Sequence, residues 1–465
     1  MLGSFLFFLA IFAAIGISSV IHSRRSQKDY YLASSSVSPL LVGLSAVATN
    51  NSGYMFIGVI GYTYSTGLAA LWIMVGWIAG DFIASQWIHR PLRQATQQTG
   101  QLSYAGVVSH WGGKANPLLK RLIGLVSVLF LLAYASAQLM AGSKALSVLF
   151  GWEMWAGAVL GAVIVAAYCM AGGIRASIWT DAAQSVVMMM AMGVLLVVAV
   201  ASLGGGADAI DAMQQVPGFL NLFPQDLIIP GLAGGLLFAL GWAFAGFSVI
   251  GQPHIMVRFM ALNESGNLNR ARFWYYLWFT AFYLMATGVG LLARVLLPDT
   301  AGFDAELALP TIALQLLPPV LVGLILAGIF AATISTADSL ILSCSSSLTQ
   351  DLLPLDKLPM WLIKAATLLV TLLALGLALA NNQTVFQLVI LSWSALGSAL
   401  APLLIALALG ARPSQRLSVV AMLTGLLVSL LWRELGWHGA VYEGAPAVLA
   451  GLLILAPAIG NRAAK

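Results

Sequence analysis

The sequence predicts an all-α polytopic membrane protein. Of its 465 residues, 60% are hydrophobic and only 8% are charged, whereas about a quarter of the residues in a soluble domain carry charge. The mean hydropathy is +0.94. Apolar windows of about 20 residues, the length that crosses a bilayer, recur along the chain and leave almost no sequence for a separate soluble domain.

Thirteen candidate spans follow from the hydropathy. Their approximate limits are 2–21, 39–62, 68–88, 119–143, 152–171, 183–203, 229–250, 273–297, 311–345, 359–380, 386–408, 417–432 and 444–459. The first span lacks a basic start and a small-residue cleavage site, so we interpret it as a retained helix rather than a signal peptide. The ninth window is too long for one crossing, and we expect a short helix, Leu309 to Leu317, ahead of the span proper.

The basic residues predict how these spans are oriented. With the loop after the first span placed in the cytoplasm, all of the 21 Lys and Arg residues except Lys144, Arg294 and Arg433 fall on the cytoplasmic side, as the positive-inside rule requires. The N-terminus is then outside and the C-terminus cytoplasmic, in the inner (cytoplasmic) membrane. The outer loops are acidic, with Asp208, Asp211, Asp226, Asp299, Asp304 and Glu306. We attribute the formal charge of +5 to this topology rather than to a nucleic-acid partner.

The second span is interrupted by small polar residues, Ala48 to Tyr54 (Ala-Thr-Asn-Asn-Ser-Gly-Tyr). Backbone groups at membrane depth must be hydrogen-bonded, so such a break is tolerated only where it lines a cavity or a site. In secondary transporters, broken helices of this kind hold the substrate and the coupling ion. The break therefore predicts a transporter.

The seventh span carries a second interruption. Glycines at positions 241, 246 and 251, followed by Pro253, weaken a helix there. The two interrupted spans are five apart, and an odd offset places them in opposite orientation across the membrane. Paired breaks in inverted halves are the best sequence indication of a transport site.

Two hydroxyl residues in the ninth span, Ser335 and Thr336, suit a sodium ion. Sodium is a hard cation that prefers oxygen ligands, and an unwound helix would add free carbonyls from Ala48 and Asn51. The alternative is that these hydroxyls only pack helices together, which is common in membranes. Together with the first break, the pair favours the ion site.

Ionisable residues inside spans are functional hypotheses by default. We assign Asp181, at the cytoplasmic mouth of the sixth span, to ion coupling or release. Asp338 lies deeper in the ninth span and is either a coupling residue or a cap on a neighbouring helix end. Asp81 and Lys144 lie near span ends, where anchoring at the membrane surface is the expected role.

Aromatic residues near the breaks suit a small organic substrate. Tyr54, Tyr134 and Trp242 are the candidates, although a lone tyrosine in a membrane helix usually packs. The five histidines are scattered, and no sequence motif of a metalloprotease, P-loop or dinucleotide-binding enzyme occurs. Cys169 and Cys344 lie in apolar spans and indicate neither a disulfide nor a thiolate metal site.

Four segments carry a resemblance to a known family: Gly251 to Ala261 (GQPHIMVRFMA), Gly172 to Asp181 (GGIRASIWTD), the Ser335-Thr336 pair and the Ser52-Gly53 pair. In these segments the chain resembles the sodium:solute symporter family, and within it the bacterial sodium/proline symporters. The resemblance covers nearly the whole chain and is strong for the family but weak for the substrate.

The resemblance implies a LeuT-type inverted five-helix repeat with about 13 transmembrane helices in a single transporter domain, 1–465. The repeats would be spans two to six and seven to eleven, in a core at 39–408. The extra first helix and its loop would occupy 1–38, and two additional helices would occupy 409–465.

The resemblance also implies a site. Its sodium ligands would be the carbonyls of Ala48, Asn51 and Ala332 and the hydroxyls of Ser335 and Thr336. Its substrate pocket would fall on Ser52, Gly53, Tyr54 and Tyr134, and Asp181 matches an aspartate linked to sodium coupling. Two residues depart from the proline symporters, which have an aspartate where this chain has Asn50 and a tryptophan where it has Tyr54.

We therefore expect a sodium-driven symporter, not an enzyme, that imports a small solute by alternating access, with an amino acid such as proline favoured. Its partners would be the solute, sodium and membrane lipid, with no nucleic acid, and we expect a monomer. One alternative is a proton-coupled symporter, because Asn50 lacks the relatives' charge. The other is a solute sensor with little transport, which would usually carry a signalling domain, and the sequence ends at Lys465 without one. A membrane-embedded enzyme would have only Asp181 and Asp338 as buried catalytic candidates.

Overall fold

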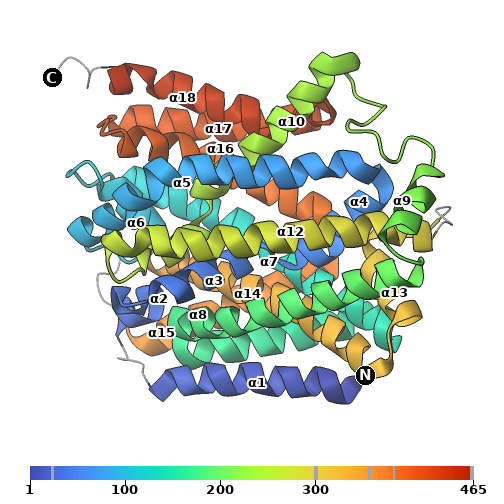
Figure 1. Cartoon of the computed structure of the whole chain (residues 1–465). Helices are drawn as coiled ribbons and strands as arrows, with labels where there is room; N and C mark the ends of the chain where they lie inside the picture. Colours follow the sequence, from blue (N-terminus) through green and yellow to red (C-terminus); the bar gives the residue numbers. More distant parts are fainter. Residues whose placement is uncertain (22–25, 298–301, 354–357, 381–382, 461–465) are drawn as a thin grey trace.

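The computed structural model describes residues 1–21, 26–297, 302–353, 358–380 and 383–460, and long helices run side by side through it (Figure 1). The α-helices are α1 (Leu2–Ile21), α2 (Gln27–Leu32), α3 (Pro39–Asn50), α4 (Ile60–Thr66), α5 (Leu71–Thr99), α6 (Tyr104–His110), α7 (Pro117–Phe150), α8 (Met154–Ser202), α9 (Gly206–Gln214), α10 (Gly231–Phe247), α11 (Pro253–Met260), α12 (Leu268–Leu296), α13 (Ala308–Leu316), α14 (Pro319–Ser346), α15 (Met360–Ala380), α16 (Val385–Ala408), α17 (Gln415–Glu434) and α18 (Gly444–Gly460). The predicted all-α membrane fold is confirmed.

Ten segments of the described chain are long and apolar enough to cross a membrane. Two of them, Tyr54–Thr99 (46 residues) and Met154–Ser202 (49 residues), would measure about 70 Å as straight helices, more than twice the ~30 Å hydrocarbon core. Each bends at a glycine with positive φ, Gly67 (φ 74°) and Gly173 (φ 58°). At Gly173 a Cβ would lie 2.5 Å from the Tyr30 carbonyl oxygen, so only glycine fits. The count of thirteen crossings stays a prediction.

The helices differ in how deeply they lie. In the most apolar windows of α14 and α16, 89% of the residues are buried, against 22% in α1 and 28% in α17. Figure 1 shows α14 near the middle of the molecule, α1 along one edge, and α17 and α18 along the opposite edge. Polar side chains on α14 are therefore surrounded by protein.

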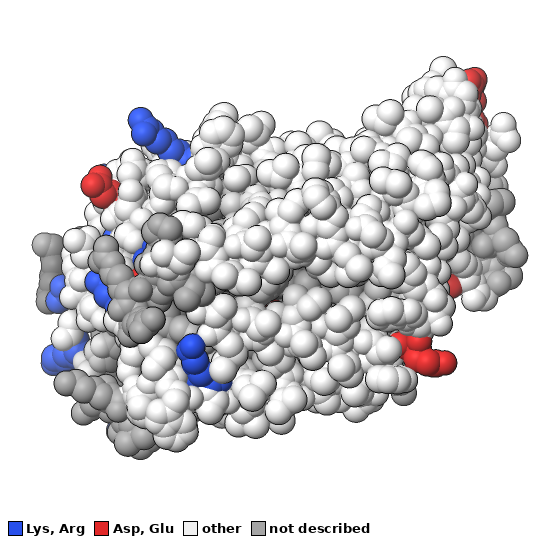
Figure 2. All heavy atoms as spheres, turned by 90° about the horizontal axis from the view of Figure 1, so that it is seen from below, with Lys and Arg blue, Asp and Glu red and all other residues white. Residues whose placement is uncertain are grey.

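Charge is separated along the helix direction. In Figure 2, Lys and Arg gather at one end and Asp and Glu mostly at the other, with a broad band between them that carries neither. Met1 lies at the acidic end, and α18 ends at the basic end (Figures 1 and 2). Which end faces the cytoplasm stays a prediction. Six of the charged residues on which this prediction rests lie outside the described residues, namely Arg24, Arg25, Lys357, Arg462, Lys465 and Asp299.

Both predicted helix breaks are confirmed. The first follows α3: Asn51 leaves the helical conformation (φ −91°, ψ 67°), and the chain resumes as a π-helix at Tyr54–Val59. The second separates α10 from α11 by a 3-10 turn, Ser248–Gly251, and an extended Gln252. The short helix expected ahead of the ninth span is also present as α13, which ends at Leu316 before α14 begins at Pro319.

Small residues bring α5 and α10 into close contact. A Cβ at Gly80 would lie 1.9 Å from the Ala243 carbonyl oxygen, and one at Gly246 would lie 2.0 Å from the Trp77 carbonyl oxygen. Because lipid supplies no hydrophobic force between helices, such close backbone packing is a main source of their association. The contact fixes α10, one half of a broken span, against α5.

Candidate functional site

The first break lies against the hydroxyl residues of α14. Ser335 Oγ donates to the carbonyl of Ala48 (3.3 Å) and to that of Ala332 (3.1 Å). Thr336 Oγ1 donates to the carbonyl of Thr49 (3.0 Å). Each of the two bonds to α3 joins residues that are 287 positions apart in the sequence. Four residues predicted as sodium ligands thus lie in one fully buried group of hydroxyl and carbonyl oxygens, namely Ala48, Ala332, Ser335 and Thr336.

The fifth predicted ligand, Asn51, lies at the break but makes its contacts within α3. Its backbone N–H donates to the Val47 carbonyl (2.8 Å), and so does its side-chain amide (3.1 Å). Sequence reasoning missed two members of the oxygen group. Thr49 supplies a carbonyl, and its hydroxyl meets Ser339 Oγ (3.2 Å). The spacing Ser335–Ser339, one helical turn, was the signal that could have indicated Ser339.

All four predicted substrate residues make polar contacts at the break. Ser52 Oγ and Tyr134 Oη are hydrogen-bonded (3.2 Å), and Ser52 Oγ also accepts the backbone N–H of Tyr54 (3.1 Å). The backbone N–H of Gly53 donates to Gln138 Oε1 (2.9 Å). The predicted residues therefore lie together, with Gln138 of α7 as a further partner.

An aromatic layer separates the break from a cavity at the acidic end. The ring of Tyr54 contacts Trp77 (centroids 5.9 Å apart) and Phe386 (5.4 Å), and Phe386 stacks on Tyr62 at 4.9 Å. Tyr62, Phe386 and Trp242 also line the cavity, whose volume is about 460 Å³. This volume lies in the range of small-molecule sites.

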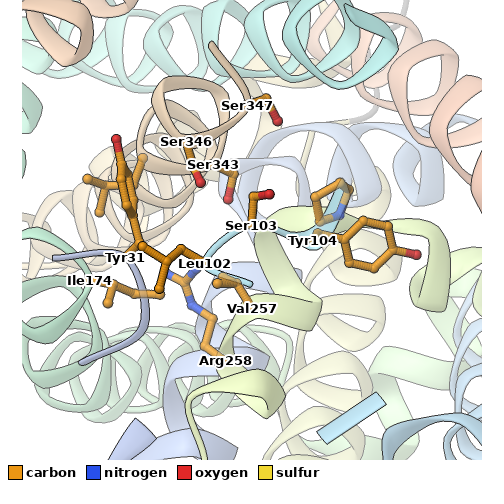
Figure 3. Close-up of a pocket in the computed structure, with 12 residues that line it drawn as sticks. Tyr31, Leu102, Ser103, Tyr104, Ile174, Val257, Arg258, Ser343, Ser346 and Ser347 are labelled. Carbon is orange, nitrogen blue, oxygen red and sulfur yellow. The ribbon is translucent and has the colours of Figure 1, made fainter. Parts of the chain in front are cut away.

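Beside Arg258 on the basic side, the cavity is narrow, about 20 Å³, with room for about one water molecule. A separate cavity of about 490 Å³ on this side is lined by Lys114 and Arg412 among others. Figure 3 shows the lining of the narrow cavity, with Tyr31, Ser343 and Arg258 contributed by three separate elements. Burial raises the pKa of Tyr31 to about 12, although its hydrogen bond with Thr349 (2.7 Å) lowers the pKa. The phenol is therefore neutral at physiological pH, and the path on this side is closed by packed, uncharged groups around Arg258.

A buried charge cluster lies between the second break and α14. The Arg258 guanidinium of α11 is fully buried; its Nη2 lies 3.4 Å from Asp181 Oδ2 and donates to Ser177 Oγ (2.9 Å) and to Ser339 Oγ. Ser177 Oγ lies 2.9 Å from Asp338 Oδ1, to which it donates. Asp181 therefore pairs with the guanidinium directly, and Asp338 is linked to it through Ser177 and Ser339. The Asp338 carboxylate accepts hydrogen bonds from the side chains of Ser177 and Ser339. In these contacts it does not cap the end of a neighbouring helix.

Asp181 is held by more than the arginine. Ser45 Oγ of α3 donates to its Oδ2 (2.6 Å), while Asp181 Oδ1 has no hydrogen-bond partner among the described residues. Sequence reasoning placed Asp181 at the mouth of a span, and in the structure its side chain is fully buried. The cluster links α3, which precedes the first break, and α11, which follows the second break, to α8 and α14.

The expectation that Asp81 and Lys144 anchor span ends is wrong for Asp81. Its side chain is fully buried, and Tyr275 Oη donates to its Oδ2 (2.7 Å). Asn50 Nδ2 in turn donates to Tyr275 Oη (2.5 Å), so Asn50 points away from the oxygen group. Lys144 lies at the acidic end and pairs with Asp304 and Glu306, each at 2.7 Å.

Gly53→Ala is expected to destabilise the break. A Cβ at Gly53 would lie 2.5 Å from the Thr333 methyl carbon and 3.0 Å from the Ala141 Cβ, and overpacking of this kind costs typically about 1–3 kcal/mol. We expect a lower melting temperature of the purified protein by several degrees. Gly376→Ala is the matched control, because its Cβ would meet nothing within 4 Å. Equal melting temperatures for the two variants would contradict this prediction.

The comparisons with known proteins agree with this geometry. The model of the sodium:solute symporter family matches residues 30–425. The high-affinity proline transporter of Bacillus subtilis (strain 168) is 29% identical over 438 residues, covering 91% of this chain and 90% of that protein. The sodium/proline symporter of Staphylococcus aureus (strain JH9) is 30% identical over 438 residues, covering 91% of this chain and 84% of that protein.

Solved structures share the fold. A Na+-coupled sialic acid symporter in a substrate-bound outward-open state superposes with a TM-score of 0.80 at 18% identity, covering 98% of this chain and 96% of that one. A nucleobase-cation-symport-1 family transporter in a closed conformation superposes with a TM-score of 0.61 at 15% identity, covering 93% and 94%. These relatives are transporters rather than enzymes, and the chain is a multi-pass membrane protein. With a family match over most of its length and paired broken helices at its centre, the chain belongs to the sodium:solute symporter family.

Proposed function

We propose that this protein imports a small amino acid, with proline favoured, together with sodium by alternating access. The observation that carries the proposal is the oxygen group at the first break, where two hydroxyls of α14 meet the carbonyls of Ala48 and Thr49. Such a group offers a hard cation several oxygen ligands without a net charge. Sodium would bind among Ala48, Asn51, Ala332, Ser335 and Thr336.

The solute would bind on the other face of the break. The N–H groups of Gly53 and Tyr54 are at the start of a helix, where a carboxylate is favoured; here they are held by the side chains of Gln138 and Ser52. The Tyr54 ring supplies an apolar wall, and Tyr134 supplies a hydroxyl. A small amino acid matches this combination of polar and apolar groups.

Access from the two sides would alternate through the broken spans. α10 lines the cavity at the acidic end, which would be the outer cavity, and α11 lines the narrow cavity beside Arg258, which would be the inner cavity. A change at the second break would therefore move a wall of each. The outer cavity is the wider of these two, which supports an outward-facing arrangement. Asp181, Asn50 and Asp338 would couple ion binding to this change.

We also propose the domain limits, the membrane orientation and the oligomeric state. The inverted repeats would form the core at 39–408, flanked by 1–38 and 409–465. The N-terminus would face outward and the C-terminus the cytoplasm, in the inner membrane, with the basic end inside as the positive-inside rule requires. The transport unit would be a monomer.

Uptake of L-proline into proteoliposomes tests the function. An inward sodium gradient is expected to drive accumulation, and replacing sodium with choline is expected to abolish it. A thermal-shift screen of other small amino acids, monocarboxylates and sugars, with and without sodium, would identify another solute by its stabilisation. Sodium-independent uptake that follows a pH gradient alone would overturn sodium coupling, and binding without uptake would favour the sensor.

A further inference from the structure

The protein interior contains a carboxylate that this transport cycle does not use. Asp81 of α5 is fully buried, Tyr275 donates to its Oδ2 (2.7 Å), and its Oδ1 has no hydrogen-bond partner within the described part of the chain. A buried ionised carboxylate is costly unless a cation or a proton offsets its charge. The structure must therefore provide one of the two.

Among the described residues, no cation forms an ion pair with Asp81. The groups that face it from α12 are the phenols of Tyr275 and Tyr276 and the guanidinium of Arg272. Arg272 donates its hydrogen bonds elsewhere, to the Ser85 carbonyl, Gln86 and Asn269.

Within the part of the chain that the structure describes, the groups that the other helices bring near Asp81 are uncharged. From α10, the atoms nearest to a Cβ on the adjacent Gly80 belong to the backbones of Ala243 and Phe247. From α3 the contact is the neutral amide of Asn50. Two phenols and one carboxylate supply too few oxygens for a hard metal ion, which takes about six ligands, whereas a proton neutralises the carboxylate without further ligands.

A chain of hydrogen bonds connects Asp81 to the first break. Asn50, the last residue of α3, donates through Nδ2 to Tyr275 Oη (2.5 Å), and Tyr275 donates to Asp81. A proton on Asp81 Oδ2 would reverse this chain: the carboxyl would donate to Tyr275, and Tyr275 would donate to the Asn50 carbonyl oxygen after the amide turns over. The charge state of Asp81 therefore selects which side of the Asn50 amide faces Tyr275.

A surface groove gives a path for the proton. A groove of about 770 Å³ runs between α5 and α12, and Tyr276 and Arg272, which face Asp81, belong to its lining together with Gln86 and Asn269. These polar side chains extend from the surface toward the buried carboxylate.

We propose that Asp81 binds a proton and that Tyr275 and Asn50 transmit its occupancy to the break in α3. The proton site stands on its own, and the coupling to sodium rests on the proposed function. Sodium at the break adds positive charge near Asn50, where the chain of hydrogen bonds from Asp81 ends. Sodium binding therefore favours release of the proton from Asp81 to solvent. Sodium affinity therefore rises with pH through the range in which Asp81 loses its proton.

Infrared difference spectroscopy tests the proton site without sodium or solute. As the pH of the purified protein is raised, the carbonyl band of a protonated carboxyl group is expected to disappear, and Asp81→Asn is expected to remove that component of the difference. Asp208→Asn, an exposed acid on α9, is the matched control and is expected to leave the spectrum unchanged. A spectrum of Asp81→Asn identical to that of the unmodified protein would overturn the proton site.

Sodium titrations followed by tryptophan fluorescence at two pH values one unit apart test the coupling. The dissociation constant for sodium is expected to fall by up to about tenfold at the higher pH, and to be pH-independent in Asp81→Asn. Tyr275→Phe keeps the carboxyl but breaks the chain, so the infrared band should remain while the pH dependence is lost; this variant decides the question if Asp81→Asn does not fold. Retained pH dependence in Tyr275→Phe would overturn the coupling, whereas absence of sodium binding in all proteins would refute the proposed function and leave the infrared result intact.

Discussion

Replacing Ser335 and Thr336 with alanine is expected to weaken sodium binding by at least about 100-fold and to abolish sodium-stimulated uptake. Loss of groups that only support metal ligands already costs about 10–100-fold, and here two proposed ligands are removed. The change also leaves the carbonyls of Ala48 and Thr49 without their hydroxyl donors. Binding of radioactive sodium to the purified protein measures the effect directly.

The controls separate ion binding from stability. Ser398→Ala with Ser429→Ala removes two buried hydroxyls that have no hydrogen-bond partner among the described residues, and this double variant should bind sodium normally. Thr336→Ser, with Ser335 unchanged, keeps both hydroxyls and should retain most of the affinity. Full sodium dependence in the double alanine variant would refute the site.

Replacing Arg258 with methionine is expected to open the inner side of the protein. The guanidinium joins α11 to α8 and α14 through Asp181, Ser177 and Ser339. Removing one partner of a buried ion pair costs about 3–5 kcal/mol, and each 1.4 kcal/mol is about tenfold in an equilibrium. The population in which these helices have separated should therefore rise by at least about tenfold.

Labelling of a cysteine in the inner cavity measures this opening. With Cys169 and Cys344 replaced by alanine, Ser343→Cys places one thiol in the lining shown in Figure 3, and Arg258→Met should accelerate its reaction with a maleimide. Arg416→Met, at an exposed position on α17, should not. Adding Asp181→Asn to Arg258→Met should recover part of the lost thermal stability, because the neutral amide no longer needs a cation. An unchanged labelling rate in Arg258→Met would show that Arg258 does not close the inner side.

The sequence was sufficient for much of the fold and for part of the site. Apolar windows of bilayer length predicted the membrane helices because every span must satisfy its own backbone. The polar run at Ala48 to Tyr54 and the glycines before Pro253 predicted both breaks, since these residues weaken a helix locally. Ser335 and Thr336 were identified because sodium prefers oxygen ligands and the first break would add free carbonyls.

Only the tertiary structure decided which buried polar groups meet. Asp81 and Tyr275 are 194 positions apart and Asn50 and Tyr275 are 225 apart, so nothing in their spacing links them, and hydropathy assigned Asp81 to a span end. The same holds for Arg258, whose partners lie on three other helices. Composition and local pattern determine that a segment is a helix in a membrane, because those depend on nearby residues; which faces turn toward one another depends on how whole helices pack, and that packing sets the partners of each buried charge.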